Sequence, residues 1–187
     1  MTTSLKLVIL DRDGTINQDS DDYVKSVDEW IPLPGALQAI ARLSHAGYRV
    51  VVVTNQSGIG RGIFDMATLN AMHNKMRCLL ATEGGRIDAI FYCPHLPDEG
   101  CCCRKPLPGL FEEVAQRYQT SLQGVAAVGD SLRDLEAAVQ SGATPFLVRT
   151  GKGKITEEKG GLPEATVVFD DLSAFVDDFL QCEQITE

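Results

Sequence analysis

The sequence predicts an α/β fold in which a doubly wound, mostly parallel sheet of Rossmann-like type carries helices on both faces. Short apolar runs alternate with helix-like stretches along nearly the whole chain, which is typical of this class. The runs are apolar at consecutive positions, as in strands that are buried on both faces. The chain has 187 residues, of which 44% are hydrophobic, and no internal repeat, so we expect one domain over residues 1–187.

Six apolar runs mark the expected strands, and the stretches between them mark the expected helices. Strands are expected at Leu5–Leu10, Tyr48–Val53, Ile87–Tyr92, Val125–Val128, Pro145–Val148 and Val167–Phe169. Helices are expected at Pro34–His45, Asp65–Thr82, Pro108–Tyr118, Leu132–Gln140 and Leu172–Cys182. Pro34 suits the first turn of a helix, and Asp65 can cap the second helix with its carboxylate.

Polar residues directly follow three of the expected strands. They occupy residues 11–15, 54–58 and 129–131. Ligands of open α/β sheets bind outside the carboxyl ends of the strands. We therefore expect these three stretches to meet on one rim of the sheet and to form the functional site.

Asp11 and Asp13 are the first candidates for chemistry on this rim. Two carboxylates so close together repel each other unless a cation lies between them, and Mg²⁺ prefers such oxygen ligands. Gly14 allows the backbone to turn sharply beside a ligand. The alternative is a strand-ending turn without a catalytic role, since Asp and Gly are both common in turns.

The other polar stretches supply further candidates, each with an ordinary alternative. Asp130 follows a strand and Asp134 lies in the first turn of the next helix, although Asp130 can also serve only as a helix cap. Thr54 and the N–H groups of its loop can hold phosphate oxygens, or they form an ordinary polar loop. Lys105 can neutralise phosphate charge, or it is a solvated surface lysine.

Four of the six cysteines crowd into one short segment that also contains a histidine. Cys93, His95, Cys101 and Cys103 supply three thiolates and an imidazole, which suits a closed, structural zinc site in a loop over residues 93–103. The alternative is a chance group of buried or redox-active thiols. The pattern leaves Cys102 unused. The other histidines and cysteines fall in expected helices, where we expect surface or packing roles for them: His45, His73, Cys78 and Cys182.

Taken in order along the chain, these parts resemble the haloacid dehalogenase superfamily of phosphohydrolases. They are Asp11-x-Asp13-Gly14-Thr15, Thr54 after an apolar run, Lys105, and Gly129-Asp130-x₃-Asp134. The resemblance implies that Asp11 attacks phosphorus and that Asp13 acts first as general acid and then as general base. It also implies Mg²⁺ bound by Asp11, the backbone carbonyl of Asp13, Asp130 and the phosphate, with Asp134 orienting the groups around the metal. In this arrangement Thr54 and Lys105 hold the phosphoryl oxygens.

Longer motifs at residues 11–17, 54–62, 93–95 and 103–106 extend the resemblance over nearly the whole chain. They resemble one branch of the superfamily, the D-glycero-D-manno-heptose-1,7-bisphosphate 7-phosphatases, which is close to the histidinol-phosphate phosphatases. This branch implies removal of the 7-phosphate on the way to nucleotide-activated heptose for lipopolysaccharide, with Arg104 paired to the second phosphate. Residues 19–24 depart from the branch by being longer. The candidate substrate contacts are Asp19, Asp22, Tyr23, Asn55, Gln56, Ser57, Arg61 and Arg104.

Charge and segment lengths limit the partners and the architecture. The net charge of −9 repels nucleic acid and anionic membranes, and no apolar run reaches transmembrane length. Residues 1–4 lead into an apolar run without the features of a signal peptide. We therefore expect a cytoplasmic monomer that acts on a small phosphorylated sugar and binds neither nucleic acid nor a membrane. The segments between Asp13, Thr54 and Lys105 leave no room for a separate cap domain, which usually needs about 50–200 residues of its own.

Three other functions remain open at this point. Histidinol-phosphate phosphatase is the alternative within enzymes, because the two groups share their motifs. A phospho-acceptor signalling module also places acidic residues, a threonine and a lysine on an α/β sheet, but Asp13 is placed to drive dephosphorylation. A zinc-stabilised scaffold with an inactive site is disfavoured because no part of the motif set is missing.

Overall fold

The computed structural model describes residues 5–186, with side chains up to Cys182. The expectation of no signal peptide concerns residues 1–4, which lie outside the described residues. The described strands are β1 (Leu7–Leu10), β2 (Arg49–Asn55), β3 (Ala89–Cys93), β4 (Ala126–Gly129), β5 (Thr144–Val148) and β6 (Val167–Phe169). They form one sheet in the order β3-β2-β1-β4-β5-β6, and all five pairings are parallel. The predicted fold class is therefore confirmed.

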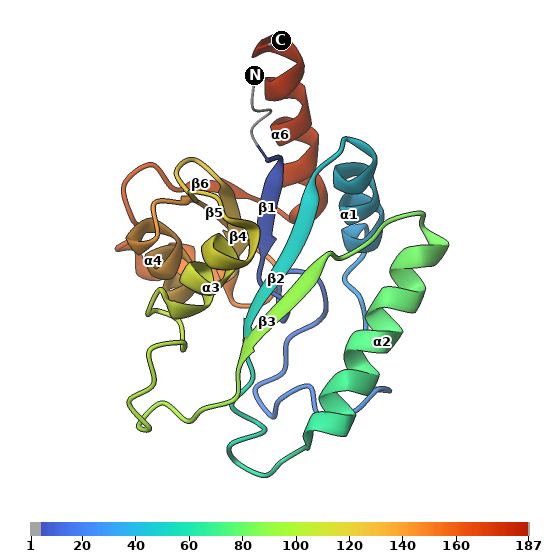
Figure 1. The fold of residues 1–187 in the computed structure, drawn as a ribbon, viewed down its shortest axis with the longest axis vertical. Helices are drawn as coiled ribbons and strands as arrows, with labels where there is room; N and C mark the ends of the chain where they lie inside the picture. The colour runs from blue at the N-terminus through green and yellow to red at the C-terminus, as the bar shows by residue number, and fades with distance from the viewer. Residues whose placement is uncertain (1–4, 187) are drawn as a thin grey trace.

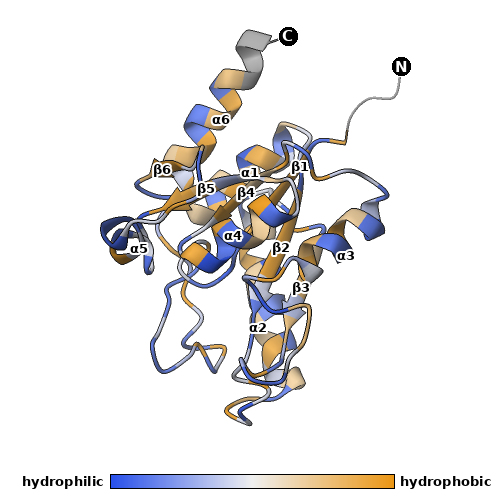
Figure 2. Cartoon of the chain, turned by 90° about the vertical axis from the view of Figure 1, so that its left-hand side faces the viewer, coloured by the Kyte–Doolittle hydropathy of each residue, from blue (hydrophilic) through white to orange (hydrophobic). Residues whose placement is uncertain are grey.

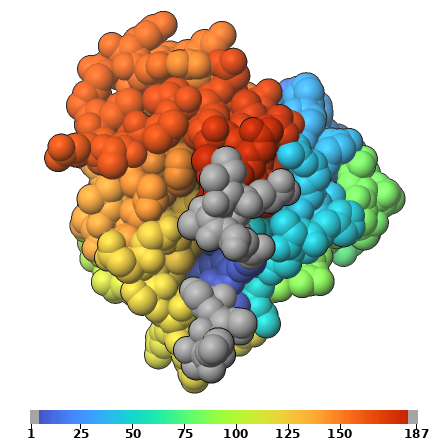
Figure 3. All heavy atoms as spheres, turned by 90° about the horizontal axis from the view of Figure 1, so that it is seen from above, coloured from blue at the N-terminus to red at the C-terminus, as the bar shows by residue number. Residues whose placement is uncertain are grey.

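Helices cover both faces of this sheet (Figure 1). They are α1 (Ala36–His45), α2 (Met66–Thr82), α3 (Gly109–Tyr118), α4 (Leu132–Gln140), α5 (Gly153–Lys159) and α6 (Leu172–Thr186). α1, α2 and α6 pack on one face, and α3 and α4 pack on the other. Seen from above, at the amino ends of the strands, α6 lies beside the segment that contains α1 (Figure 3).

The two faces of the sheet have separate cores because successive side chains of a strand point to opposite faces. In β1, Val8 and Leu10 join the core under α1, α2 and α6, whereas Leu7 and Ile9 join the core under α3 and α4. Both sets are buried, which explains why the strand is apolar at every position. Figure 2 shows the same contrast, since β2 is hydrophobic along most of its length while the covering helices carry both hydrophobic and hydrophilic residues.

Local signals in the sequence account for several helix ends. Asp65 caps α2, because its carboxylate accepts a hydrogen bond from the Thr68 N–H at 2.8 Å. The capping box at the start of α4 pairs Ser131 with Asp134. Helix α5 was not predicted, because seven residues with mostly exposed side chains give no apolar periodicity. Among the described residues, no helix combines the length and the apolar character needed to cross a bilayer.

Candidate active site

The pocket lies where the strand order of the sheet reverses. The chain adds strands outward from β1 toward β3 and outward from β4 toward β6, so that β1 and β4 meet at the topological switch point. A pocket of about 180 Å³ opens there. A wider neighbouring groove lacks Asp11 and Asp13, so the smaller pocket is the candidate site. Its lining comes from all the predicted rim loops: Asp11, Asp13, Asp19, Ser20, Asp21, Tyr23, Val24, Thr54, Asn55, Gln56, Ser57, Arg104, Lys105, Asp130, Arg133 and Lys152.

Lys105 is the central cation of this pocket. Its Nζ lies 2.8 Å from Asp11 Oδ1 and 2.7 Å from Asp134 Oδ1, and it donates to the Val53 carbonyl oxygen at 2.7 Å. Burial alone lowers the pKa of Lys105, but the two carboxylates outweigh burial and hold this pKa above its usual value. The side chain is only 2% exposed, so the alternative of a solvated surface lysine is wrong.

Asp130 is held in a cradle made by two glycines. A Cβ atom on Gly14 would lie 2.0 Å from Asp130 Oδ2, and one on Gly151 would lie 2.2 Å from the same oxygen. Both glycines also have positive φ, +81° and +55°. The Lys152 N–H donates to Asp130 Oδ2 at 2.8 Å, and the Thr150 hydroxyl donates to the Gly14 carbonyl at 2.6 Å. The loops after β1 and β5 therefore close around this one carboxylate.

Carboxylate oxygens of Asp11, Asp130 and Asp134 all lie within 4.8 Å of one another. Burial and the charge of Asp134 raise the pKa of Asp11 to about 6, although Lys105 opposes the shift. Burial and the charges of Asp134 and Asp11 raise the pKa of Asp130 to about 8. Burial and mutual repulsion thus both disfavour the charged forms of these carboxylates, and a hard divalent cation is the ligand that relieves such crowding.

Asp134 differs from the other two carboxylates because both of its oxygens are engaged. Oδ1 pairs with Lys105 at 2.7 Å, and Oδ2 accepts from the Ser131 N–H at 3.0 Å and from the Ser131 hydroxyl. Burial raises the pKa of Asp134, but Lys105 and Arg133 outweigh burial and lower it. This geometry suits a residue that holds Lys105 in place.

Asp13 points into a ring of hydrogen-bond donors. Arg12 Nη2 donates to Oδ1 at 2.8 Å and to Oδ2 at 2.9 Å, and Arg12 Nε lies 3.1 Å from Oδ1. Asn17 Nδ2 donates to Oδ1 at 2.8 Å, and Gln56 Nε2 donates to Oδ2 at 2.9 Å and to Thr54 Oγ1 at 2.9 Å. Thr54 and Asp13 are thereby brought together by Gln56, although they follow different strands.

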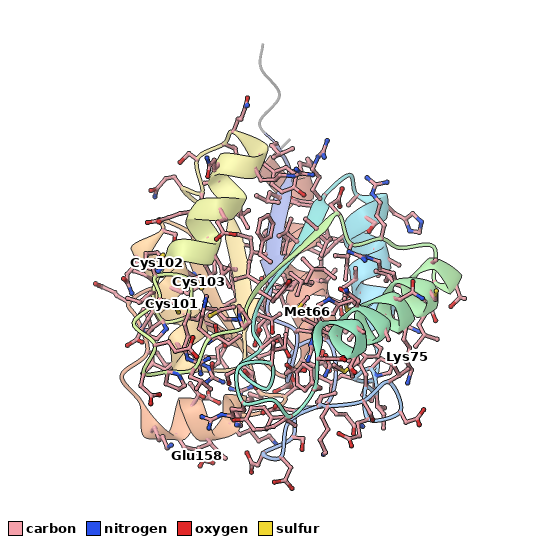
Figure 4. All side chains as sticks on the ribbon, turned by 60° about the horizontal axis from the view of Figure 1, so that its bottom comes forward. Met66, Lys75, Cys101, Cys102, Cys103 and Glu158 are labelled. Carbon is pink, nitrogen blue, oxygen red and sulfur yellow. The ribbon has the colours of Figure 1, made fainter. Side chains whose placement is uncertain are left out.

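The loop after β3 is tied to the same rim. The Asn55 side chain donates to the Lys105 carbonyl at 3.0 Å and accepts from the Lys105 N–H at 3.1 Å. Arg104 Nη1 donates to the His95 carbonyl at 3.3 Å, so the residue before Lys105 is bonded to the cysteine-rich segment. Figure 4, in which the carboxyl ends of the strands come forward, shows Cys101, Cys102 and Cys103 together on this loop, away from Lys75 of α2.

The predicted metal-binding cysteines and histidine do converge. Cys93 Sγ lies 3.7 Å from Cys101 Sγ and 3.5 Å from His95 Nδ1, and His95 Nδ1 lies 3.2 Å from Cys103 Sγ. All four ligand atoms lie within 4.8 Å of one another. Cys102 is exposed and outside this group. Burial and the neighbouring thiols of Cys93 and Cys101 raise the pKa of Cys103.

Six of the eight predicted substrate contacts line the pocket. The other two, Asp22 and Arg61, are exposed and lie outside its lining, and the Arg61 guanidinium stands 6.0 Å from the centre of the Tyr23 ring. Among the remaining histidines, His45 is exposed and His73 is buried.

Sequence reasoning missed two cations of the pocket, Arg133 and Lys152. Lys152 Nζ lies 3.4 Å from Asp19 and 3.3 Å from Asp21, and so connects the loop after β5 to the long loop after β1. The signal was present, because Gly151-Lys152-Gly153 follows the fifth expected strand at the same rim. Arg133 lies between Asp130 and Asp134 in the sequence and could have been found from that position alone.

A parallel α/β sheet with an acidic pocket and a buried lysine at its switch point defines the class of HAD-like phosphohydrolases. The sequence profile of the family described as HAD-hydrolase-like matches residues 102–175, and that of polynucleotide kinase 3 phosphatase matches residues 6–136. The chain is 62% identical to the D-glycero-beta-D-manno-heptose-1,7-bisphosphate 7-phosphatase of Bordetella bronchiseptica over 95% of this chain and 99% of the relative. It is 39% identical to the enzyme of the same name from Escherichia coli O6:H1, over 81% and 84% of the two chains.

A solved structure gives the same result. The D,D-heptose 1,7-bisphosphate phosphatase of B. bronchiseptica, in complex with magnesium and phosphate, superimposes with a TM-score of 0.94 at 62% identity, covering 95% of this chain and 99% of that one. The chain therefore belongs to the D-glycero-beta-D-manno-heptose-1,7-bisphosphate 7-phosphatase family of HAD-like hydrolases. It is a phosphatase, and the readings as a signalling module or as an inactive scaffold are set aside.

Proposed function

We propose that this chain removes the 7-phosphate of D-glycero-beta-D-manno-heptose 1,7-bisphosphate in a Mg²⁺-dependent reaction. The observation that carries the proposal is the pocket at the switch point, where Asp11, Asp13, Thr54, Lys105 and Asp130 converge. The B. bronchiseptica relative, which was solved with magnesium and phosphate, supports it. The family resemblance implies that the product supplies nucleotide-activated heptose for lipopolysaccharide.

We assign the steps of the reaction to this chain's own residues. Asp11 attacks phosphorus through Oδ1 or Oδ2 and becomes an aspartyl phosphate, while the P–O bond to the sugar breaks. Asp13 gives its proton to the departing sugar oxygen, and then takes a proton from the water that hydrolyses the aspartyl phosphate. Thr54 and Lys105 hold the phosphoryl oxygens, and Lys105 offsets their charge. Asp134 keeps Lys105 in position through the 2.7 Å ion pair.

The donor set of the pocket fits Mg²⁺. The ligands proposed are Asp11, Asp130 and the backbone carbonyl of Asp13, all of them oxygens as Mg²⁺ requires. The two glycines that leave space only for the Asp130 carboxylate fix one of these ligands, and burial together with the neighbouring carboxylates raises the pKa values of Asp11 and Asp130, so that a cation would favour their charged forms. When bound, the cation supplies positive charge to the phosphoryl group and neutralises the carboxylates around it.

Substrate selection is assigned to the mouth of the pocket. Arg104 lines the pocket but is not needed for the reacting phosphate, and its planar guanidinium suits the second phosphate of a bisphosphate. The other proposed contacts are Asp19, Asp22, Tyr23, Asn55, Gln56, Ser57 and Arg61, of which Asp22 and Arg61 do not line the pocket. Histidinol phosphate carries no second phosphate, so Arg104 favours the heptose bisphosphate.

A structural zinc ion is proposed for Cys93, His95, Cys101 and Cys103. In a tetrahedral site with Zn–S of about 2.3 Å and Zn–N of about 2.0 Å, sulfurs lie about 3.8 Å apart and sulfur lies about 3.5 Å from nitrogen. The distances of 3.7 Å between Cys93 and Cys101 and 3.5 Å between Cys93 and His95 match these values, and the 3.2 Å between His95 and Cys103 is somewhat shorter. Four protein ligands leave no open position, so this ion is assigned a structural role in holding the segment before Arg104.

We further propose that residues 1–187 form one domain, that the protein is a cytoplasmic monomer, and that nucleic acid and membranes are not its partners. All described strands belong to one sheet, which supports the single domain. The six cysteines, all within the described residues, form no disulfide, which suits a reducing compartment. The net charge of −9 opposes binding to polyanions.

The test is turnover of the purified protein on heptose 1,7-bisphosphate and on histidinol phosphate, with and without Mg²⁺. Phosphorus NMR of the heptose product identifies which phosphate is lost. We expect loss of the 7-phosphate only with Mg²⁺, and a higher kcat/KM than for histidinol phosphate. Arg104→Ala is expected to shrink this preference, and Arg117→Ala, an exposed arginine on α3, is the matched control. A higher kcat/KM for histidinol phosphate would disprove the substrate proposal while leaving the phosphatase class intact.

A further inference from the structure

Arg12 is a buried cation that takes no part in the proposed reaction steps. Its side chain is 0% exposed, although it lies on the rim loop between Asp11 and Asp13. A buried charge is costly unless it is paired and hydrogen-bonded. Its Nε and Nη2 donate three hydrogen bonds of 2.8 to 3.1 Å to the Asp13 carboxylate. This fork fixes the plane of the Asp13 carboxylate as well as compensating its charge.

The remaining nitrogen of the guanidinium reaches a helix that follows β2. Arg12 Nη1 lies 3.3 Å from Nε2 of His73, which is only 4% exposed. A guanidinium has no acceptor, so His73 Nε2 must accept this bond through its lone pair, and the imidazole is neutral with its proton on Nδ1. The surroundings of His73 also favour the neutral imidazole, because burial and the charges of Arg12 and Arg77 lower the pKa of His73 to about 3.

His73 belongs to a firmly packed element. It lies on α2, whose inner face buries Leu69, Met72, Met76 and Leu80 in the core under the sheet. Asp13, in contrast, lies on a loop, and the long Arg12 side chain has many rotamers when nothing holds it. A neutral acceptor on α2 gives the guanidinium a fixed point, and the guanidinium in turn fixes the carboxylate.

We propose that His73 and Arg12 form a positioning clamp, in which His73 acts through Arg12 to hold the Asp13 carboxylate where it meets the leaving sugar oxygen. The inference rests on the proposed role of Asp13 as general acid. Asn17 and Gln56 complete the ring around Asp13, at 2.8 and 2.9 Å, but each of them bonds only one carboxylate oxygen. The clamp makes His73 a positioning residue for departure of the leaving group, since it touches neither substrate nor metal ligand.

This role predicts a dependence on the leaving group. An alkoxide such as the sugar oxygen needs a proton as it departs, whereas p-nitrophenolate leaves without one. The value of kcat/KM reports the steps up to departure of the leaving group, so it isolates the acid role of Asp13 from its later base role. A misplaced Asp13 therefore lowers kcat/KM for heptose 1,7-bisphosphate but hardly for p-nitrophenyl phosphate, whereas general damage lowers both.

The experiment measures kcat/KM on both substrates, with Mg²⁺, for four variants. His73→Leu removes the acceptor, and we expect a loss of about tenfold on the heptose bisphosphate and less than about twofold on the aryl phosphate. His73→Gln keeps an acceptor oxygen and is expected to restore most of the loss. Met76→Leu, a buried change one turn further along α2, controls for repacking and is expected to change neither value. Asp13→Ala reports the full effect of losing the acid.

The outcomes separate the inference from the function on which it rests. Suppose that Asp13→Ala lowers kcat/KM more for the heptose bisphosphate than for the aryl phosphate, whereas His73→Leu lowers both values equally or not at all. This result overturns the clamp and leaves the general-acid role of Asp13 intact. Equal losses on both substrates in Asp13→Ala overturn the general-acid role and the clamp with it. A larger loss on the heptose bisphosphate in both variants, reversed by His73→Gln, supports the clamp. If His73→Leu does not fold, His73→Met, which also removes the acceptor nitrogen but keeps a longer apolar side chain, is measured in its place, with the same losses expected and equal losses on both substrates again overturning the clamp.

Discussion

The acidic pocket and the cysteine cluster are two candidate metal-binding groups that this chain builds in opposite ways. The cysteine cluster draws all four ligands from residues 93–103, so that its geometry depends on one loop. The acidic pocket draws Asp11 from the end of β1 and Asp130 from the end of β4, and its supporting residues come from loops after β3 and β5. The first group can assemble locally, whereas the second exists only when the whole sheet is formed.

The two groups also differ in the space beside their ligands. The closed sulfur and nitrogen set leaves no position for a substrate, which suits a structural ion. The carboxylates of Asp11 and Asp130 line a pocket of about 180 Å³, which suits a site that exchanges a cation and a phosphate. The comparison predicts that changes in the pocket remove activity without loss of fold, and that changes in the cluster remove stability first.

The largest effect is expected from Asp11→Asn. The amide is not a nucleophile, so the aspartyl phosphate cannot form, and we expect kcat to fall by at least about 10⁴-fold. Circular dichroism and the melting temperature are expected to stay close to wild type or to rise, because one of the crowded carboxylates has been neutralised. Activity within tenfold of wild type would remove Asp11 from its proposed role.

The next effect concerns the cradle of Asp130. Gly151→Ala places a Cβ atom 2.2 Å from Asp130 Oδ2 and is expected to move this carboxylate, weakening Mg²⁺ binding by roughly 10 to 100-fold. Gly160→Ala is the matched control, because Gly160 also has positive φ (+72°) but nothing lies within 4 Å of its Cβ position. Calorimetric titration of each variant with Mg²⁺ is the measurement. Equal affinities in the two variants would show that backbone strain, and not the cradle, explains any change.

These two groups show which residues of a site can be predicted from the sequence and which cannot. The cysteine cluster was predicted complete, because four ligands within one loop leave their spacing in the sequence. Asp11, Thr54, Lys105 and Asp130 were also found, since the carboxyl ends of parallel strands must share a rim. Lys152 was missed although it follows a predicted strand, because its ion pairs with Asp19 and Asp21 join two loops that are far apart in the sequence. The bond between Arg12 and His73 joins a loop to a helix through space, and no local pattern records such a contact.

A smaller effect is expected from removal of the zinc ligands. Cys103→Ser opens the proposed tetrahedral set, and we expect loss of bound zinc and a lower melting temperature, equivalent to a few kcal/mol. Activity is expected to fall less than tenfold at low temperature, because Lys105 is also held by Asp11, Asp134 and the Val53 carbonyl, all of which lie outside this loop. Cys102→Ser, an exposed neighbour outside the cluster, is the control and is expected to keep the zinc. Elemental analysis that finds no zinc in the wild-type protein contradicts the assignment.

The smallest effect is a pH dependence of stability that comes from His73. Burial, Arg12 and Arg77 lower the pKa of His73 from an ordinary value of 6.5 to about 3 in the folded protein. Between pH 3 and pH 6.5, His73 is therefore protonated in the unfolded chain but neutral in the folded protein. This contribution to stability is therefore fully present above about pH 6.5 and is lost as the pH falls toward 3, at no more than about 1.4 kcal/mol per pH unit.

Asp11 and Asp130 act in the opposite direction, because their raised pKa values make the folded protein bind protons more readily than the unfolded chain. The two contributions are separated by measuring the free energy of unfolding of wild type and of His73→Gln between pH 4 and 8. The aspartates contribute equally to both proteins, so the difference isolates the histidine. We expect the wild type to lose stability relative to the variant as the pH falls below about 6.5, since glutamine does not titrate. A pH-independent difference would show that His73 is not buried in the neutral form that its bond with Arg12 requires.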